Sequence, residues 1–111
     1  MEFNEYKKLA LRTRKHWDKK DKDLEMAYYT LGLVGEAGEV VEVVKKHLVG
    51  SHEINPALIK KELGDVLWYT AAISEYFGFD MNEIAQLNID KLAARHGDTW
   101  SGYGDRSGTG A

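Results

Sequence analysis

The chain of 111 residues contains no cysteine and only one proline. Without cysteine it can form neither a disulfide framework nor a thiolate metal site. It also lacks a basic surplus, because its net charge is −3 and its pI is about 5.8, so no nucleic-acid partner is predicted. Acidic residues interrupt every apolar run before it could span a bilayer, and Glu2 and Glu5 stand where a signal peptide would be basic and then apolar. We therefore predict a cytoplasmic protein with no membrane partner.

The positions of capping residues, apolar stripes and glycines predict an all-α fold of four helices. The first helix is predicted to be capped by Asn4, and its apolar stripe reaches Trp17. The others are predicted at about Leu24–Val49 before Gly50, at Pro56–Phe77 between the cap Asn55 and Gly78, and from the capping box Asp80/Glu83 to Arg95. Residues 1–98 are predicted to form one helical domain, and the glycine- and serine-rich residues 99–111 a flexible tail.

Two predicted helices carry acidic pairs within apolar sequence. Glu36 and Glu39 lie in the stretch Leu31–Val44, and Glu62 and Asp65 lie at the start of the next apolar helix. A spacing of three residues places both members of a pair near one helix face. Facing pairs would form a four-carboxylate cluster suited to a hard divalent cation, and the absence of histidine from both pairs favours a magnesium-like, all-oxygen site.

A simpler interpretation remains open, because acidic residues at this spacing are common on solvated helix faces. Glu42 is turned about 120° from Glu36 and fits that interpretation. The glycines argue for a special site, since Gly32, Gly35 and Gly38 interrupt one helix and each costs about 1 kcal/mol relative to alanine. Their clustering predicts that a ligand or another backbone approaches closely there.

The spacing Glu36-x-x-Glu39, then 22 residues, then Glu62-x-x-Asp65 resembles the signature of the MazG-like nucleoside triphosphate pyrophosphohydrolases. The surrounding sequences GLVGEAGEVVEVVKK and ELGDVLWY agree, as does Asn88-x-x-Lys91-Leu92, and the resemblance covers about Tyr28 to Trp100. It implies a four-helix MazG-like bundle completed by assembly into homodimers or homotetramers. It also implies Mg²⁺-dependent cleavage of the α–β bond of (d)NTPs to monophosphate and pyrophosphate, with Glu36, Glu39, Glu62 and Asp65 as metal ligands.

Carboxylate-held Mg²⁺, or Mn²⁺ in its place, suits this reaction because it neutralises phosphate charge and activates a water. We predict that Glu39 takes the proton of that water. Predicted substrate contacts come from several helices: Asn88, Lys91 and Arg95 on one face of the last helix, Lys46 as a further phosphate partner, Tyr69 beside the acidic face, and Trp17 or Trp68 as a stacking surface.

Assembly is also predicted from length. A helix over Leu24–Val49 would be roughly 39 Å long, whereas a compact monomer of this size has a radius of gyration of only about 13 Å.

Two alternative functions stay open. One is a phosphoribosyl-ATP pyrophosphohydrolase-like enzyme. The other is a non-catalytic helical oligomerisation module with a structural cation, which would have no use for the donors Asn88 and Lys91.

Overall fold

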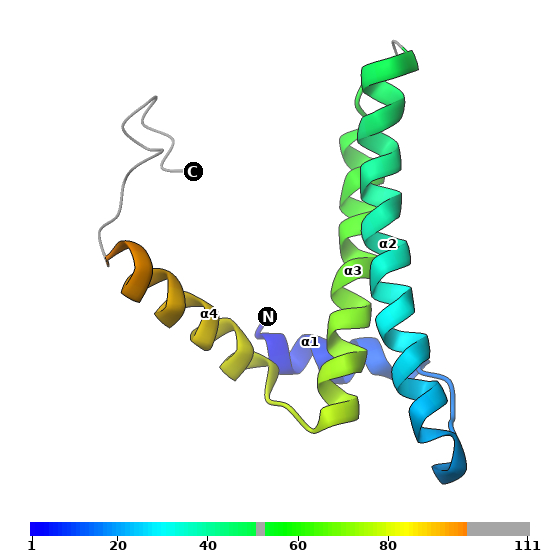
Figure 1. Ribbon diagram of the computed structural model, residues 1–111, viewed down its shortest axis with the longest axis vertical. Helices are drawn as coiled ribbons and strands as arrows, with labels where there is room; N and C mark the ends of the chain where they lie inside the picture. Colours follow the sequence, from blue (N-terminus) through cyan, green and yellow to red (C-terminus); the bar gives the residue numbers. More distant parts are fainter. Residues whose placement is uncertain (51–52, 98–111) are drawn as a thin grey trace. The chain divides into compact units, whose positions relative to one another are not determined.

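The computed structural model describes residues 1–50 and 53–97, and this part of the chain contains four α-helices and no strand (Figure 1). The elements are α1 (Phe3–Ala10), the 3-10 turns η1 (Leu11–Thr13) and η2 (Lys19–Asp21), α2 (Lys22–Gly50), α3 (Pro56–Phe77) and α4 (Met81–His96). The all-α prediction is confirmed. Among these helices, none is long and apolar enough to cross a membrane.

The chain divides into two compact units, which are described separately. The first runs from Met1 to Met81 and contains α1, α2 and α3, and the second begins at Asn82 and contains nearly all of α4. The single domain over residues 1–98 stays a prediction, and the predicted tail at 99–111 lies outside the described residues.

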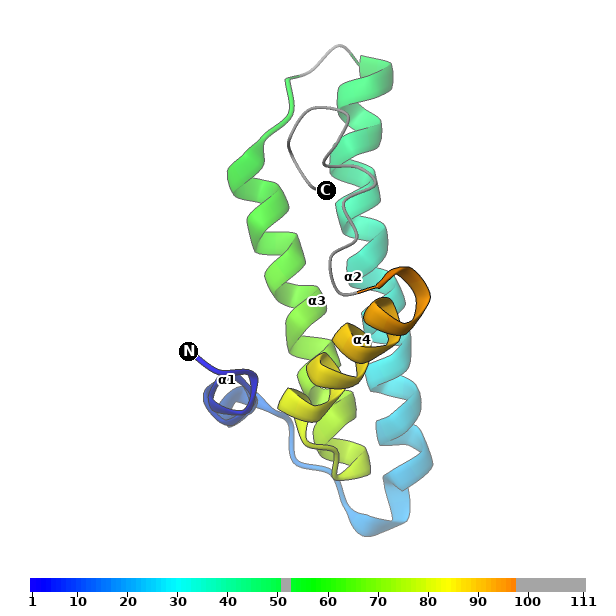
Figure 2. The same cartoon turned by 90° about the vertical axis from the view of Figure 1, so that its left-hand side faces the viewer.

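The first unit is built on α2 and α3, which run side by side in opposite directions (Figures 1 and 2). Near the start of α2, the Tyr76 hydroxyl donates a hydrogen bond to the Lys22 carbonyl at 2.9 Å. Further along, Gly32 meets Tyr69, and Glu36 lies opposite Glu62 and Asp65. The antiparallel register therefore brings the two acidic stretches of the sequence together.

Local capping defines α3 as the sequence predicted. The Asn55 side chain accepts a hydrogen bond from the Leu58 N–H at 3.2 Å, and Pro56 occupies the first turn. At the other end Gly78 has a φ of 72°, a left-handed conformation in which a Cβ is unfavourable. The bounds Pro56–Phe77 are confirmed because both ends are determined by adjacent residues.

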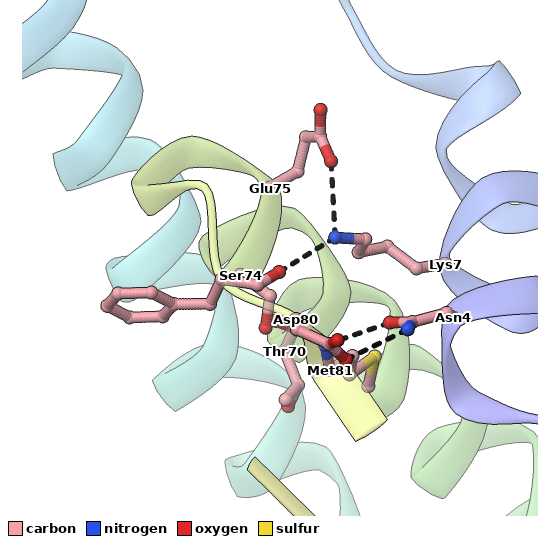
Figure 3. A network of polar contacts seen from close by, with 8 residues as sticks. Asn4, Lys7, Thr70, Ser74, Glu75, Asp80 and Met81 are labelled. Atoms are coloured by element: carbon pink, nitrogen blue, oxygen red, sulfur yellow. Dashed lines mark hydrogen bonds and ion pairs between the residues drawn. The ribbon is translucent and has the colours of Figure 1, made fainter. Parts of the chain in front are cut away.

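Asn4 does not cap α1, and that prediction is wrong. Glu2 holds the cap position of α1 and makes no side-chain cap bond. The Asn4 side chain instead accepts a hydrogen bond from the Met81 N–H at 2.9 Å and donates one to Asp80 at 2.8 Å (Figure 3). It therefore satisfies a backbone donor at the start of α4, 77 residues away.

The first helix is also shorter than predicted, because α1 ends at Ala10 and Trp17 lies outside any helix. The Trp68 indole N–H donates to the Ala10 carbonyl at 3.0 Å and to the Thr13 hydroxyl at 3.1 Å. The last carbonyl of α1 and a hydroxyl of η1 thus accept hydrogen bonds from α3, which gives the Ala10 carbonyl a partner where the helix ends.

The buried core of the first unit is small and partly polar. It contains Tyr29, Ala71, Ala72 and Met81, together with Glu25 and Ser74. The Tyr29 hydroxyl donates a 3.0 Å hydrogen bond to the Glu25 carboxylate. Burial and this negatively charged acceptor raise the pKa of Tyr29 to about 12, so the phenol stays neutral.

The sequence predicted that a ligand or another backbone approaches the glycines, but at Gly32 it is the Tyr69 side chain that lies close. A Cβ on Gly32 would clash with Cε1 of Tyr69, so the tyrosine ring fills the space that glycine leaves. Gly35, Gly38 and Gly64 have no such neighbour within 4 Å in the described part of the chain.

Replacing Gly32 by alanine is expected to destabilise the fold, because the Tyr69 ring or helix α2 must move. We expect Gly32→Ala to lower the free energy of unfolding by about 1–3 kcal/mol, measured by urea denaturation. The control Gly64→Ala has open space and is expected to keep or gain stability, by up to about 1 kcal/mol. In a Tyr69→Leu background the cost of Gly32→Ala should shrink, and an unchanged cost would contradict the contact.

Candidate functional site

Three of the four predicted metal ligands meet between α2 and α3. Glu36 from α2 and Glu62 and Asp65 from α3 each offer a carboxylate oxygen, and these three atoms lie within 4.8 Å of one another. Glu36 and Glu62 are half-buried, whereas Asp65 is exposed. This arrangement offers oxygen ligands from two helices to one divalent cation.

The electrostatics of Glu36 reflect this crowding. Burial raises the pKa of the Glu36 carboxyl above its usual range, and the negative charges of Asp65, Glu62 and Glu39 raise it further. A carboxylate in this position is stabilised either by a proton or by a cation. The cluster therefore favours binding of positive charge.

Glu39, the fourth predicted ligand, lies one turn further along α2 and is exposed. It is not among the three carboxylates whose oxygens meet, although its charge acts on Glu36. Instead it lines a cleft of about 280 Å³ that adjoins the cluster through Glu62. The remaining lining residues are Glu42, Val43, Lys46, His47, Glu53, Asn55 and Leu58.

This cleft places Lys46, a predicted phosphate partner, on the same surface as Glu39 and Glu62. It also contains Glu42, which the sequence indicated as a solvated residue and which is exposed here. His47 lines the same cleft, although no ligand-like spacing in the sequence pointed to it. The cleft beside the carboxylate cluster thus contains one lysine among four glutamates.

Tyr69 lies one turn after Asp65 on α3, where the charges of Glu36 and Asp65 act on it. Burial raises its pKa above the usual range, and contact with Tyr28 and the charges of Glu36 and Asp65 raise it further. Its phenol therefore stays neutral near the carboxylates and keeps a proton that it can donate.

The two aromatic residues predicted for stacking have different surroundings. Trp17 packs on Tyr28 with ring centroids 5.5 Å apart, and Tyr28 lies 6.5 Å from Tyr69, so Trp17 belongs to an aromatic surface that reaches the cluster. The buried indole N–H of Trp17 lies near the Tyr29 hydroxyl without meeting hydrogen-bond geometry. Trp68, by contrast, uses its N–H to hold the end of α1.

Sequence reasoning missed two tyrosines at this site. Burial raises the pKa of Tyr6 on α1, and the charge of Asp65 adds to the effect, which places Tyr6 near the cluster. Tyr28 bridges Trp17 and Tyr69. No local pattern reveals Tyr6, whereas Tyr28 stands two helical turns before Glu36 and could have been found by its spacing.

The last three predicted substrate contacts lie on α4 in the second unit. Asn88, Lys91 and Arg95 are all exposed there. Their spacing of three and then four residues places them on one side of the helix.

Comparisons with known proteins agree with this pattern of residues. A family model of the MazG nucleotide pyrophosphohydrolase domain matches residues 25–100. The Gene 37 protein of Mycobacterium phage L5 is 38% identical over 74 residues, which are 63% of this chain and 65% of the phage protein. Its name states no activity, and no solved structure matches the chain.

The matched region contains the three clustered carboxylates, the adjoining Glu39 and the donors of α4. It spans well over half of the 111 residues. The resemblance noted in the sequence is therefore confirmed, and the chain belongs to the MazG nucleotide pyrophosphohydrolase domain family.

Proposed function

We propose that this protein is a Mg²⁺-dependent pyrophosphohydrolase that cleaves the α–β phosphoanhydride of (d)NTPs to a nucleoside monophosphate and pyrophosphate. The observation that carries the proposal is the meeting of Glu36, Glu62 and Asp65, with the pKa of Glu36 raised by burial and by its acidic neighbours. Hydrolysis of a phosphoanhydride requires neutralisation of phosphate charge and a nucleophilic water.

The residues present fit a magnesium ion. All the clustered donors are carboxylate oxygens, the ligand type that Mg²⁺ prefers, and Mn²⁺ accepts the same set. When bound, such an ion neutralises phosphate oxygens and acidifies a coordinated water. Glu36, Glu62 and Asp65 would hold it, and Glu39 joins them if its side chain turns toward the cluster.

Glu39 is our proposed proton acceptor for the attacking water. Its exposed carboxylate stands beside the cluster but is not gathered into it, so it is available for proton transfer. Around it, Lys46 offers a positive charge in the cleft, and Tyr69 and Trp17 offer a phenol and an aromatic surface for the nucleoside. On α4, in the second unit, Asn88, Lys91 and Arg95 stay predicted phosphate contacts from the sequence.

We also propose that two or more copies assemble through α2. Leu31, Val34, Val41 and Leu48 follow one stripe of this helix and are between 63% and 73% exposed. Gly35 and Gly38 lie along the same stripe, with open space where their Cβ atoms would stand. A helix from a second copy can approach closely over these glycines and cover the apolar side chains. A homodimer or a homotetramer satisfies this requirement.

The metal proposal predicts a thermal shift. Free Mg²⁺ at ten times its Kd should stabilise the folded protein by roughly 1.4 kcal/mol, or about 6–10 °C in Tm. Glu62→Gln should blunt that shift and, by removing one negative charge, leave the metal-free protein at least as stable as wild type. The control Glu42→Gln should keep the full shift. A metal-free Glu62→Gln protein that melted well below wild type would identify Glu62 as a structural hydrogen-bond partner instead.

The reaction predicts pyrophosphate, not orthophosphate, as the released product from a panel of (d)NTPs with Mg²⁺. Glu39→Gln should lower kcat by about 10²–10⁴-fold while preserving most of the metal-induced thermal shift, because it removes a base and spares the clustered ligands. Lys91→Ala should raise KM or lower kcat with nearly unchanged Mn²⁺ affinity by calorimetry.

Several outcomes would contradict the proposed reaction. Orthophosphate as the sole product, or full turnover in EDTA, would exclude it. A metal-induced thermal shift without turnover of any nucleotide would indicate a non-catalytic module with a structural cation. Turnover restricted to phosphoribosyl-ATP would indicate the related enzyme class.

The assembly predicts a mass of at least twice 12.6 kDa in light scattering at micromolar concentration. Val34→Glu places a charge on the apolar stripe of α2 and should lower the measured mass toward that of one chain. Leu9→Glu, at an exposed apolar position of α1, is the matched control and should leave the assembly intact. A wild-type protein that scatters as a monomer would refute this interface.

A further inference from the structure

The positive charge of this acidic protein is concentrated in one short segment. Eight of its 15 lysines and arginines lie between Lys7 and Lys22, where only two acidic residues occur. The segment comprises the second half of α1, both 3-10 turns, the chain between them and the first residue of α2. The net charge of the whole chain conceals this local surplus.

Part of this segment surrounds a pocket of about 330 Å³, a size typical of small-molecule sites. Its lining consists of Lys7, Lys8, Leu11, Arg12, Arg14 and Glu75. Four cations and one carboxylate thus face the same hollow between the end of α1, η1 and the last turns of α3.

Only one of the four cations is neutralised within the described residues. Lys7 pairs with Glu75 at 3.4 Å and donates a hydrogen bond to the Phe79 carbonyl at 2.8 Å (Figure 3). The neighbouring Lys15 is also engaged, since its ammonium lies 4.4 Å from the centroid of the Trp17 ring.

Within residues 1–50 and 53–97, the other three cations of the pocket form no hydrogen bond or ion pair; they are Lys8, Arg12 and Arg14. Glu75, the single acid of the pocket, is already engaged with Lys7. Among the described residues, the pocket therefore has three cations without an ion-paired acid, although the charge of Arg14 also acts on Tyr29. Their mutual repulsion favours the binding of an anion.

The chemistry of these cations defines the anion. Guanidinium groups match phosphate oxygens with paired N–H donors, and lysine adds a point charge. Three uncompensated charges balance a chain of two or three phosphates better than a single phosphate. We propose that this pocket binds an oligophosphate, either free or as the phosphate chain of a nucleotide.

This site is separate from the carboxylate cluster. Glu75 lies ten residues after Asp65 on α3, a separation of roughly 15 Å along the helix axis. The pocket holds a single carboxylate, and its cations attract phosphate directly. The proposal therefore does not depend on the metal-assisted reaction and can be tested without turnover.

The test is calorimetric titration of the full chain with inorganic tripolyphosphate in metal-free buffer at 150 mM salt, without chelator. We expect one binding event per chain. The variant Lys8→Gln/Arg12→Gln/Arg14→Gln should lose at least about tenfold in affinity. The control Lys19→Gln/Lys20→Gln/Lys60→Gln removes the same charge outside the pocket and should lose no more than about twofold, because salt screens distant charges.

Titration with ATP separates the two sources of oligophosphate, and AMP, which has a single phosphate, is the weakly binding control. Equal pocket-dependent affinities for tripolyphosphate and ATP support a free oligophosphate, and tighter binding of ATP supports a nucleotide-borne chain. If the triple variant loses its helical circular dichroism signal, the single variant Arg12→Gln replaces it in the test. We expect Arg12→Gln to lower the affinity for tripolyphosphate by about threefold or more.

Three results would overturn the proposal. The first is no binding of tripolyphosphate at millimolar concentration, and the second is an equal loss of affinity in the pocket and control variants. The third is tighter pocket-dependent binding of a single-stranded oligonucleotide than of tripolyphosphate, which would assign the surface to nucleic acid.

Discussion

The close packing of α2 against α3 is the constraint on which the site depends. The Tyr69 ring occupies the space that a side chain at Gly32 would fill, so α2 and α3 approach each other closely at this pair of residues. One turn away, the antiparallel register sets Glu36 opposite Glu62 and Asp65. The glycine that weakens α2 as an isolated helix therefore allows the carboxylates to face one another.

This arrangement concentrates negative charge between α2 and α3, two helices whose apolar side chains remain partly exposed in a single chain. The core consists of a few residues, and the apolar stripe of α2 is largely exposed. Burial and then the charges of its acidic neighbours raise the pKa of Glu36, so the site opposes ionisation of this carboxyl. Both features favour binding: the carboxylate cluster favours a cation, and the apolar stripe favours burial against a second protein surface.

The short helix α1 is held in the first unit by polar contacts with residues far away in the sequence. The Trp68 indole holds its C-terminal end, and Asn4 holds the backbone at the start of α4. These contacts bring Tyr6 near Asp65 and hold the cations that follow on α1 and η1 beside Glu75. A segment of little intrinsic helical stability thus links the carboxylate cluster to the basic pocket.

The sequence by itself determined those features that depend on residues close together in the chain. Asn55, Pro56 and Gly78 define α3 through contacts within a few residues, and helical periodicity is sufficient to identify the acidic faces that hold Glu36, Glu62 and Asp65. Only the tertiary structure decided that Asn4 serves α4, that Trp17 leaves the helix and that Glu39 stands outside the three-carboxylate group. These outcomes depend on hydrogen bonds and packing between residues far apart in the chain, and local propensity carries no information about such partners.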